Sequence, residues 1–550
     1  MTFLIKKKIK GNFYLYLAKN ARIKGKTRRI WEKYIGPENK INEQTEILID
    51  PDPSIITFDF GLPIALMQII KNLKLVEIIN ECTNKRAQGL SVGHYIVLAA
   101  INRCVKPTSK AKLRVWFEHT ALFKEFPPIE TYLDSMAYTN HFKYLTEEVL
   151  ENIEECINKK LIDVFNVSMN TLFYDPTNFF TYINPKEGVE LPRHGHSKEN
   201  RFTLNLVGLT LFCTKDGGLP VLHDIYPGNV QDAKLFKKQI PRLLDRLKRV
   251  GINPEEICLV FDKGNLSPKA FDQINAANIH FICSIRPSMQ KEFDALTPAD
   301  FSLEPLPNGK KIGVLEFARK VYGPTDRMLV VYNPRMKAWQ EKNLRIKLEK
   351  KIEAVKEWFK DRLNVKKWRK PETVENKIQS ILKTKKYLEL VDYTVSGTFE
   401  HVNYEIKINE DALEAHLDTL GKSYFLSNHP EMTPLELVWL YRQQYTVERA
   451  FKYIKSPSLL SVKPIYHWTD DSIRGHLFTC VLGLLLLTLL TRKIQLKFKQ
   501  MSIWNIVECL SEIELAIIKY KGTRKTIKKL VDVSPEAAEL SKFLELESSV

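Results

Sequence analysis

The order of strand-like and helix-like stretches in the middle of the chain predicts a mixed α/β fold, and two of the strands end in aspartate. A run of strands is followed by a helix, a strand, a helix and a further strand, an order typical of a mixed sheet covered by helices. The strand stretches are "TLFYD" (171–175), "RFTLNLVGLTLFCT" (201–214), "LPVLHDIY" (219–226), "ICLVFD" (257–262) and "IHFICSI" (279–285), with a helical pattern over 232–250.

Net charge points to a polyanionic partner. Lys and Arg (83) exceed Asp and Glu (65) by 18. Such an excess attracts nucleic acid, because each neutralised phosphate releases condensed counterions. The alternative is a lysine-rich bias of a whole low-GC genome, which would give the same charge without a DNA partner.

Changes of hydrophobic period and composition divide the 550 residues into six regions. Because a domain usually holds about 100–200 residues, we expect several compact units. The regions are a basic β-hairpin with a linker (1–50), a helical, DNA-binding domain (51–168), a first part of the α/β core (169–289), an insertion of strands and long charged helices (290–425), a second part of the core (426–495) and a helical C-terminal region (496–550).

Charge is concentrated in two of these regions. Residues 1–36 hold eleven Lys or Arg and one acid, Glu32, while residues 336–386 hold 17 Lys or Arg and 7 acids. Lys110, Lys112 and Arg114, in the helical domain, are further candidates for DNA contacts. In each case a solvated surface without a DNA contact is the alternative.

Cysteine and apolar patterns predict a cytoplasmic protein without a membrane segment. None of the eight cysteines forms a C-x-x-C pair, so we expect reduced core residues rather than a zinc site. The N-terminus has no pattern of a signal peptide. The apolar run at 478–490 is 13 residues, short of the roughly 20 that cross a bilayer, and therefore predicts a buried helix.

Asp175 and Asp262 each follow an apolar strand. Asp175 precedes Pro176, so we expect its strand to stop there and to present the carboxylate at an open end. Asp262 is followed by a turn at Gly264. Either aspartate alone is more commonly a turn residue or a helix cap.

Glu448 lies in a predicted helix, "YRQQYTVERAFKYIKS" (441–456). Spacings of three, four, three and four place one set of side chains on a single helix face. The members are Tyr441, Gln444, Glu448, Phe451 and Lys455. The alternative is an ordinary amphipathic helix with a surface ion pair between Glu448 and Lys452.

Three carboxylates from distant parts of the sequence suit phosphodiester chemistry. Two divalent ions about 3.5–4 Å apart can stabilise the attacking and the leaving oxygen when carboxylates hold them. Mg²⁺ prefers such oxygen ligands. His194 and His196 raise the alternative of a transition-metal site, but no further His or Cys lies nearby, and we expect them in a loop near the DNA.

Ordered motifs give the chain a family resemblance. Tyr441, Glu448 and Lys455 match the spacing Y-x2-R-x3-E-x6-K of the YREK signature. The chain thereby resembles insertion-sequence transposases of the DDE class. The stretches 195–236, with its Gly228-Asn229-x-x-Asp232 step, and "FDKGNLS" (261–267) look similar to the same family, as does the sequence after Lys455. The resemblance runs from about 170 to 490.

The resemblance implies an RNase H-like core with a β-rich insertion before the catalytic glutamate, and the activity of a DNA transposase. Cleavage at the terminal inverted repeats would free a 3′-OH that attacks target DNA. Asp175, Asp262 and Glu448 would hold two Mg²⁺ ions, with Mn²⁺ tolerated. We expect a homodimer in the DNA complex and association with the nucleoid. The expected DNA contacts are Tyr441, Lys455, Lys198, Arg201 and Lys452.

One position departs from the signature, because Gln444 stands where the family has arginine. An arginine there would clamp a phosphate with two hydrogen bonds, which glutamine cannot do. Arg442 and Arg449 lie about 100° or more around the predicted helix from Glu448. Two alternatives stay open: a nuclease of the same fold that joins no strands, and an inactive, domesticated DNA-binding protein.

Overall fold

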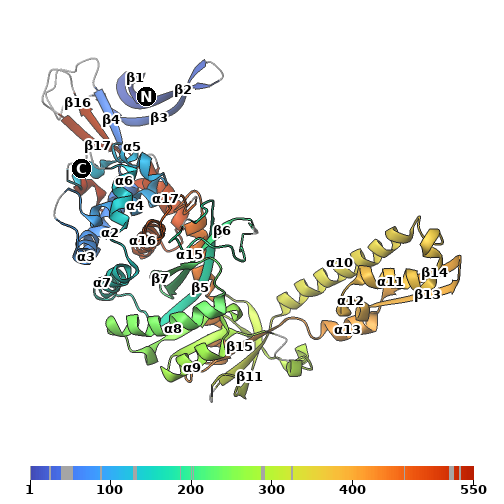
Figure 1. Ribbon diagram of the computed structural model, residues 1–550. Helices are drawn as coiled ribbons and strands as arrows, with labels where there is room; N and C mark the ends of the chain where they lie inside the picture. Colours follow the sequence, from blue (N-terminus) through green and yellow to red (C-terminus); the bar gives the residue numbers. More distant parts are fainter. Residues whose placement is uncertain are drawn as a thin grey trace. The chain divides into compact units, whose positions relative to one another are not determined.

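The computed structural model has two compact units, Met1–Ile257 with Gln444–Val550 and Cys258–Gln443 (Figure 1). The mixed α/β architecture agrees with the prediction. The structure describes residues 2–23, 26–38, 54–86, 89–127, 133–185, 187–199, 201, 203–286, 291–323, 326–463, 465–519, 526–531 and 534–550.

An antiparallel sheet of three strands, rather than the expected hairpin, begins the first unit. It comprises β1 (Thr2–Ile9), β2 (Asn12–Ile23) and β3 (Lys26–Pro37). Lys10 and Gly11 both have positive φ and join Ile9 to Asn12, as a two-residue hairpin turn requires. The lysine-rich sequence of β1 did not indicate a strand, although lysines are common on exposed edge strands.

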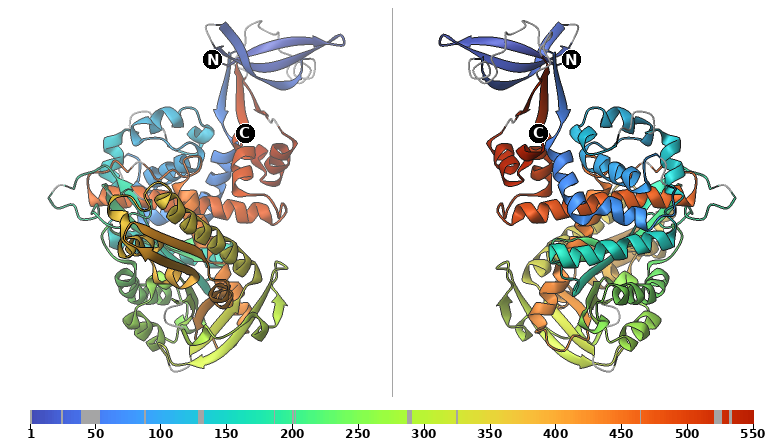
Figure 2. Two further views of the ribbon diagram at one scale, coloured as in Figure 1. Left: turned by 90° about the vertical axis from the view of Figure 1, so that its right-hand side faces the viewer. Right: turned by 90° about the vertical axis from the view of Figure 1, so that its left-hand side faces the viewer.

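A second small sheet combines one strand from the N-terminal part of the chain with two strands from the C-terminal part. Its order is β17 (Thr526–Val531), β16 (Glu514–Lys519) and β4 (Ser54–Asp59), all antiparallel. Both views in Figure 2 show the blue strand β4 beside the red strands β16 and β17. The expectation of a purely helical region at 496–550 is therefore wrong, since these strands lie between α17 (Ile503–Glu512) and α18 (Pro535–Phe543).

Helix α16 (Asp470–Gln495) lies at the centre of the helical part of the first unit. It is long and apolar enough to cross a membrane, but 94% of its most apolar window is buried inside the protein. The predicted buried helix is thus present and longer than the apolar run alone. Around it pack α2 (Gly61–Leu73), α4 (Val92–Val105), α6 (Ser135–Phe142) and α17, with α3 (Leu75–Glu81), α5 (Leu113–Phe117) and α7 (Glu147–Phe165) completing the helical part.

Lys110 is buried in this helical part, with 7% of its surface exposed. Its ammonium group lies 5.6 Å from the Tyr138 ring and 5.7 Å from the Phe142 ring. The expected DNA contact of Lys110 is therefore wrong. The neighbouring Lys112 and Arg114 are exposed.

An antiparallel meander forms the α/β part of the first unit. It contains β5 (Thr171–Thr181), β6 (Asn205–Thr214) and β7 (Pro220–Pro227), followed by α8 (Asp232–Arg249). Helix α15 (Tyr445–Lys455) packs against β5 and β6, and α16 packs against β7. Residues 205–214 are all buried, as expected of a central strand covered on both faces.

The second unit is built on a mixed sheet of order β10-β11-β12-β15-β9-β8. β8 (Cys258–Phe261) and β9 (His280–Ser284) are parallel and joined through α9 (Pro268–Ala276), whereas the other described pairs are antiparallel. The further strands are β10 (Leu303–Pro305), β11 (Lys311–Arg319), β12 (Asp326–Tyr332) and β15 (Lys422–Ser427). Helix α14 (Pro434–Arg442) ends the unit.

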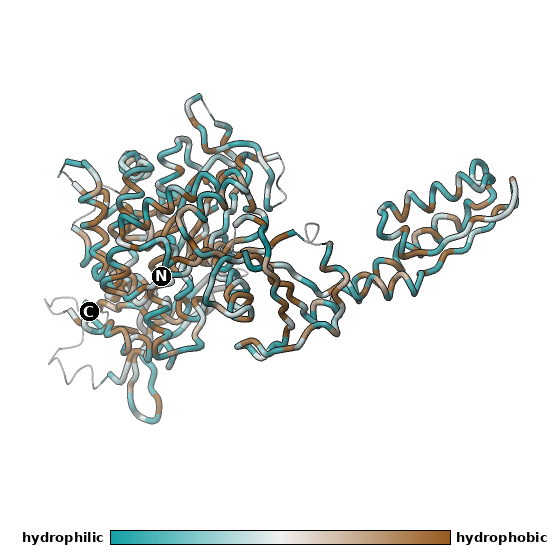
Figure 3. Tube along the Cα trace, turned by 90° about the horizontal axis from the view of Figure 1, so that it is seen from below, coloured by the Kyte–Doolittle hydropathy of each residue, from teal (hydrophilic) through white to brown (hydrophobic). Residues whose placement is uncertain are grey.

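The part of the insertion that has its own core is shorter than residues 290–425, because β10, β11, β12 and β15 continue the sheet of β8 and β9. Residues 334–421, here called the insertion module, contain α10 (Pro334–Phe359), α11 (Pro371–Leu382), α12 (Lys385–Leu390), β13 (Val391–Thr398), β14 (His401–Ile408) and α13 (Glu410–Leu417). Its core includes Leu348, Val355 and Ile378, all fully buried. Figure 3 shows brown, hydrophobic positions alternating with teal, hydrophilic ones along the helices and strands of the module.

The two ends of the insertion module meet. The backbone N–H of Asn333 donates to the carbonyl of Gly421 at 2.9 Å. Tyr332 and Lys422 are opposite each other in the pairing of β12 with β15. The module is therefore attached to the sheet between two adjacent strands.

Candidate active site

Asp175 lies inside β5, not at its end. The strand continues through Pro176, which pairs opposite Thr210 of β6, so the prediction that proline stops the strand is wrong. The pairing of β5 with β6 continues before and after Pro176, because proline is tolerated in a strand where its missing N–H is not needed for a hydrogen bond of the sheet. Asp175 is half-buried, and its neighbour Tyr174 packs on Phe236 of α8.

Successive strand residues point to opposite faces, so Asp175 and Thr177 share the face opposite Tyr174. Helix α15 covers that face. The Lys455 ammonium donates to Thr177 Oγ1 at 2.9 Å and lies 5.4 Å from the centre of the Phe179 ring. The C-terminal end of α15 is thereby held beside Asp175.

Glu448 lies seven residues before Lys455, about 10.5 Å along the same helix face. At the other end of α15, Thr446 lies against Gly218, which follows β6. Since Thr214 of β6 pairs with Leu172, α15 runs alongside β5 in the same direction, and Glu448 lies on the part that passes Asp175. Glu448 is exposed, and in the described part of the chain its carboxylate forms no ion pair with Lys452.

The predicted single helix over 441–456 is divided in two. Helix α14 ends at Arg442, α15 begins at Tyr445, and the chain passes from the second unit to the first between Gln443 and Gln444. Here the backbone bonds span three residues instead of four: Gln443 N–H to Leu440 and Val447 N–H to Gln444. Tyr441 therefore belongs to the second unit, and Gln444 is buried rather than presented to a substrate.

Asp262 lies directly after β8, as predicted, and accepts two hydrogen bonds within the second unit. The Ser284 hydroxyl at the end of β9 donates to Asp262 Oδ1, and the Tyr441 hydroxyl donates to the same oxygen at 3.1 Å. Burial, with a contribution from the Asp262 charge, raises the pKa of Tyr441. Tyr441 thus remains a donor and fixes the orientation of the Asp262 carboxylate.

A cluster of charged side chains borders β5 just after Asp175. Lys198 donates to the Pro176 carbonyl at 2.6 Å and lies 3.3 Å from Asp232. Arg201 lies over the Phe180 ring at 5.7 Å. The structure thus brings Lys198, Arg201 and Lys455 together around one strand, whereas Lys452 is exposed without a described partner.

Sequence reasoning missed Glu199 and Lys463 in this cluster, and Ser284 beside Asp262. Lys463 contacts Glu199 and lies 4.3 Å from the centre of the Phe180 ring. Lys463 belongs to the family-like stretch after Lys455, which gave a signal for it. Nothing in the sequence singles out Glu199 or Ser284, because both depend on tertiary contacts.

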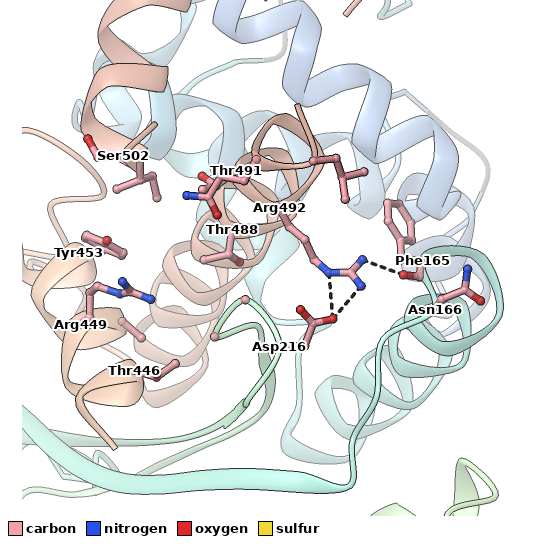
Figure 4. Close-up of a pocket in the computed structure, with 16 residues that line it drawn as sticks. Phe165, Asn166, Asp216, Thr446, Arg449, Tyr453, Thr488, Thr491, Arg492 and Ser502 are labelled. Carbon is pink, nitrogen blue, oxygen red and sulfur yellow. Dashed lines mark hydrogen bonds and ion pairs between the residues drawn. The ribbon is translucent and has the colours of Figure 1, made fainter. Parts of the chain in front are cut away.

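The other side of α15 lines a pocket of about 640 Å³. Figure 4 shows Arg449 and Tyr453 on α15, with Thr446 below them, facing Arg492 of α16. Arg492 donates to Asp216 and to the Phe165 carbonyl, which ties α16 to the β6–β7 turn and to the end of α7. Arg449 therefore lies away from Glu448, and it does not take the place of the missing signature arginine.

The donor chemistry of Asp175, Asp262 and Glu448 suits a hard divalent cation, since all three offer carboxylate oxygens. Asp175 and Glu448 belong to the first unit and Asp262 to the second. Among the residues that the structure describes, no group of three or more His, Cys, Asp or Glu side chains is placed to hold a metal ion. His194 and His196 are exposed in the loop before Lys198.

Comparison with known families identifies the family of the chain. A family model described as "Transposase DDE domain" matches residues 175–482, more than half of the chain. The chain belongs to the DDE transposase family. The match begins at Asp175 and contains Asp262 and Glu448, so this transposase carries its three candidate acids within the conserved domain. It is an enzyme that acts on DNA, and its family depends on divalent metal ions.

Solved structures and curated proteins add little to the family match. The chain is similar to a solved structure of a piggyBac transposase in a synaptic complex with hairpin DNA. The similarity covers 90% of this chain and 84% of the piggyBac chain, with 8% sequence identity and a TM-score of 0.36. A search of curated proteins finds no match. The assignment to the YREK group stays a prediction.

Proposed function

We propose that this transposase cleaves DNA at the terminal inverted repeats of its element and transfers the freed 3′-OH into target DNA. The observation that carries the proposal is the family match over residues 175–482, which contains Asp175, Asp262 and Glu448. The two DNA ends are paired by a homodimer. In the cell the protein is associated with the nucleoid.

Asp175, Asp262 and Glu448 hold two Mg²⁺ ions in this proposal, with Mn²⁺ accepted. Such ions activate the attacking oxygen and neutralise charge on the phosphate and the leaving oxygen. The chain's own contribution is to fix the ligands. Ser284 and Tyr441 orient the Asp262 carboxylate, and the rigid strand β5 fixes Asp175.

Lys455 and the neighbouring Lys198 and Arg201 bind the DNA backbone. Lys455 is held by Thr177 on the strand of Asp175, so a phosphate bound there lies close to that acid. Lys452 and Tyr441 are expected as additional contacts. For Tyr441 the hydrogen bond to Asp262 supports a positioning role as well.

Strand transfer separates the proposal from its alternatives. The assay uses element-end duplexes, found as inverted repeats flanking the coding region, with a supercoiled target plasmid and Mg²⁺. We expect 3′-end cleavage and joined products, both lost on chelation by EDTA and both reduced at least about 10³-fold in Asp175→Asn. Asp245→Asn, which removes an exposed carboxylate of α8, is the control with the same change of charge.

Each other result supports an alternative. Cleavage without joined products would indicate a nuclease. DNA binding without cleavage, equal in Asp175→Asn and in the unaltered protein, would indicate an inactive DNA-binding copy, for which the buried Gln444 in place of arginine is the specific reason.

A further inference from the structure

Glu199 bridges two lysines beside the strand of Asp175. Its Oε1 lies 3.4 Å from the Lys455 ammonium, and its Oε2 contacts the Lys463 ammonium. The three side chains are 23%, 26% and 23% exposed for Glu199, Lys455 and Lys463. All three side chains therefore keep part of their surface in contact with solvent.

Both ammonium groups have supports other than Glu199. Lys455 donates to Thr177 and lies over Phe179, while Lys463 lies over Phe180 at 4.3 Å. The hydroxyl and the two rings belong to Thr177, Phe179 and Phe180 of β5, which pairs with β6 along this stretch. The two positive charges thus stay in place when the carboxylate leaves. Burial lowers the pKa of Lys455, and the Glu199 charge opposes that shift.

The backbone of Glu199 is fixed by hydrogen bonds of the loop, whereas its side chain is held through two lysines. The Ser197 hydroxyl accepts from the N–H of Glu199 at 3.2 Å and of Arg201 at 3.0 Å, and Asn178 accepts from the N–H of Lys198. Glu199 Oε1, by contrast, is buried and accepts no hydrogen bond from the described residues. Among the described residues, the carboxylate is held by its ion pair with Lys455 and by the ion pair and hydrogen bond from Lys463.

A phosphodiester offers the same pattern of acceptors as this carboxylate, two charged oxygens on one central atom. We propose that Lys455 and Lys463 form the site for one phosphate of the DNA backbone, and that Glu199 occupies this site until DNA displaces it. The inference rests on the proposed function, because it refines the DNA contact of Lys455. It adds Lys463 as a DNA ligand and Glu199 as an internal competitor.

The exchange keeps both ammonium groups paired with an anion, because a phosphate replaces the carboxylate that leaves. A phosphate that takes its place releases counterions from the DNA, which adds a favourable term that the carboxylate lacks. The competitor thus lowers DNA affinity modestly and acts only until a phosphate is positioned at the site.

The test is DNA binding by the full-length protein without Mg²⁺, measured by fluorescence anisotropy with a labelled duplex of arbitrary sequence over a range of KCl concentrations. We expect Glu199→Gln to tighten binding roughly fivefold. Asp245→Asn changes the net charge equally but lies on α8, paired with Arg249 of its own helix, and is expected to change affinity less than about twofold.

A second variant tests the site itself. Lys463→Met is expected to weaken binding and to reduce the slope of log K against log salt by about 0.9, the value for one phosphate contact. In the Lys463→Met protein, adding Glu199→Gln should raise the affinity for DNA no more than adding Asp245→Asn does. A gain that persists without Lys463, or a Glu199→Gln protein that binds DNA no better than Asp245→Asn or more weakly, overturns the inference.

These outcomes separate the inference from the proposed function. If Lys455→Met and Lys463→Met bind DNA as tightly as the unaltered protein, the assignment of this cluster to DNA fails, and the inference fails with it. If both weaken binding while Glu199→Gln behaves like its control, only the role of Glu199 is wrong. Thermal unfolding of each variant shows that the compared proteins are folded.

Discussion

At the scale of single residues, the hydroxyl groups around Asp262 are the clearest case of a positioning role. Tyr441 and Ser284 donate to one oxygen, Oδ1, and so leave the other free to bind a cation. Hydrogen bonds to a charged group contribute about 1.5–3 kcal/mol. Losing one donor is therefore expected to change the orientation of the Asp262 carboxylate.

We expect Tyr441→Phe to lower the rate constant of DNA cleavage roughly tenfold while the affinity for DNA changes little. Single-turnover cleavage and anisotropy measure the two quantities separately. Tyr393→Phe is the control, because it removes a hydroxyl that accepts from Gln379 in the insertion module. A variant with weaker DNA binding and an unchanged cleavage rate would contradict the positioning role and support a direct contact with DNA.

His476 links stability to pH. It is buried in α16, donates through Nε2 to the Val462 carbonyl, and has His467, Lys110 and Arg103 nearby. Burial, with the repulsion of these groups, lowers its pKa well below the ordinary value of 6.5. As the pH falls below 6.5, the unfolded chain therefore binds a proton that the folded chain does not.

Stability should accordingly be lost as the pH falls from 6.5 toward the lowered pKa of His476, by about 1.4 kcal/mol per pH unit for this one group. Hydrogen exchange of the α16 amides at several pH values measures the effect. His476→Gln should flatten the dependence, whereas His401→Gln, an exposed position in β14, should leave it unchanged. Equal slopes in the two variants would show that another group dominates.

At the scale of elements, the insertion module is stabilised by a core of its own. Leu348 of α10 is fully buried in that core, while Ile346, two residues earlier, is 37% exposed. One helix thus offers a matched pair of substitutions. Only the buried side chain leaves a cavity when it is shortened.

We expect Leu348→Ala to destabilise the module by about 3 kcal/mol and Ile346→Ala by less than about 1 kcal/mol. Hydrogen exchange should show faster opening of α10, β13 and β14 in Leu348→Ala, with the protection of α16 unchanged. Equal loss of protection in both units would mean that the module does not unfold independently.

Local sequence was sufficient for elements whose pattern is strong. It placed the buried helix around 478–490 and the strands before Asp175 and Asp262. It failed where tertiary pairing overrides the local signal. The lysine-rich β1, the short β16 and β17, and the continuation of β5 through Pro176 are stabilised by partners that the sequence alone does not reveal.

The candidate site was predictable in its residue types but not in its contacts. Spacing put Tyr441 and Glu448 on one helix, whereas the chain turns at Gln443–Gln444 and Tyr441 bonds to Asp262 instead. The roles of Glu199 and Ser284 depend on residues far away in the sequence. No local pattern could have identified them.

At the scale of the whole molecule, net charge should dominate DNA binding. An excess of 18 positive charges attracts the DNA backbone without regard to its sequence. If about six to ten phosphates are neutralised, the affinity for a duplex should fall roughly 10³- to 10⁵-fold between about 50 and 200 mM salt. Anisotropy titrations over this range measure the slope, and a nearly flat dependence would contradict an electrostatic binding surface.

The insertion module lies between two residues that are paired in the sheet. Because Tyr332 and Lys422 already stand opposite each other, a tight turn of a few residues would connect the same two strands. Removal of the module would therefore leave the pairing of β12 with β15 unchanged. The 185 residues between Asp262 and Glu448 include this module, so the length of that interval does not determine the geometry of the sheet.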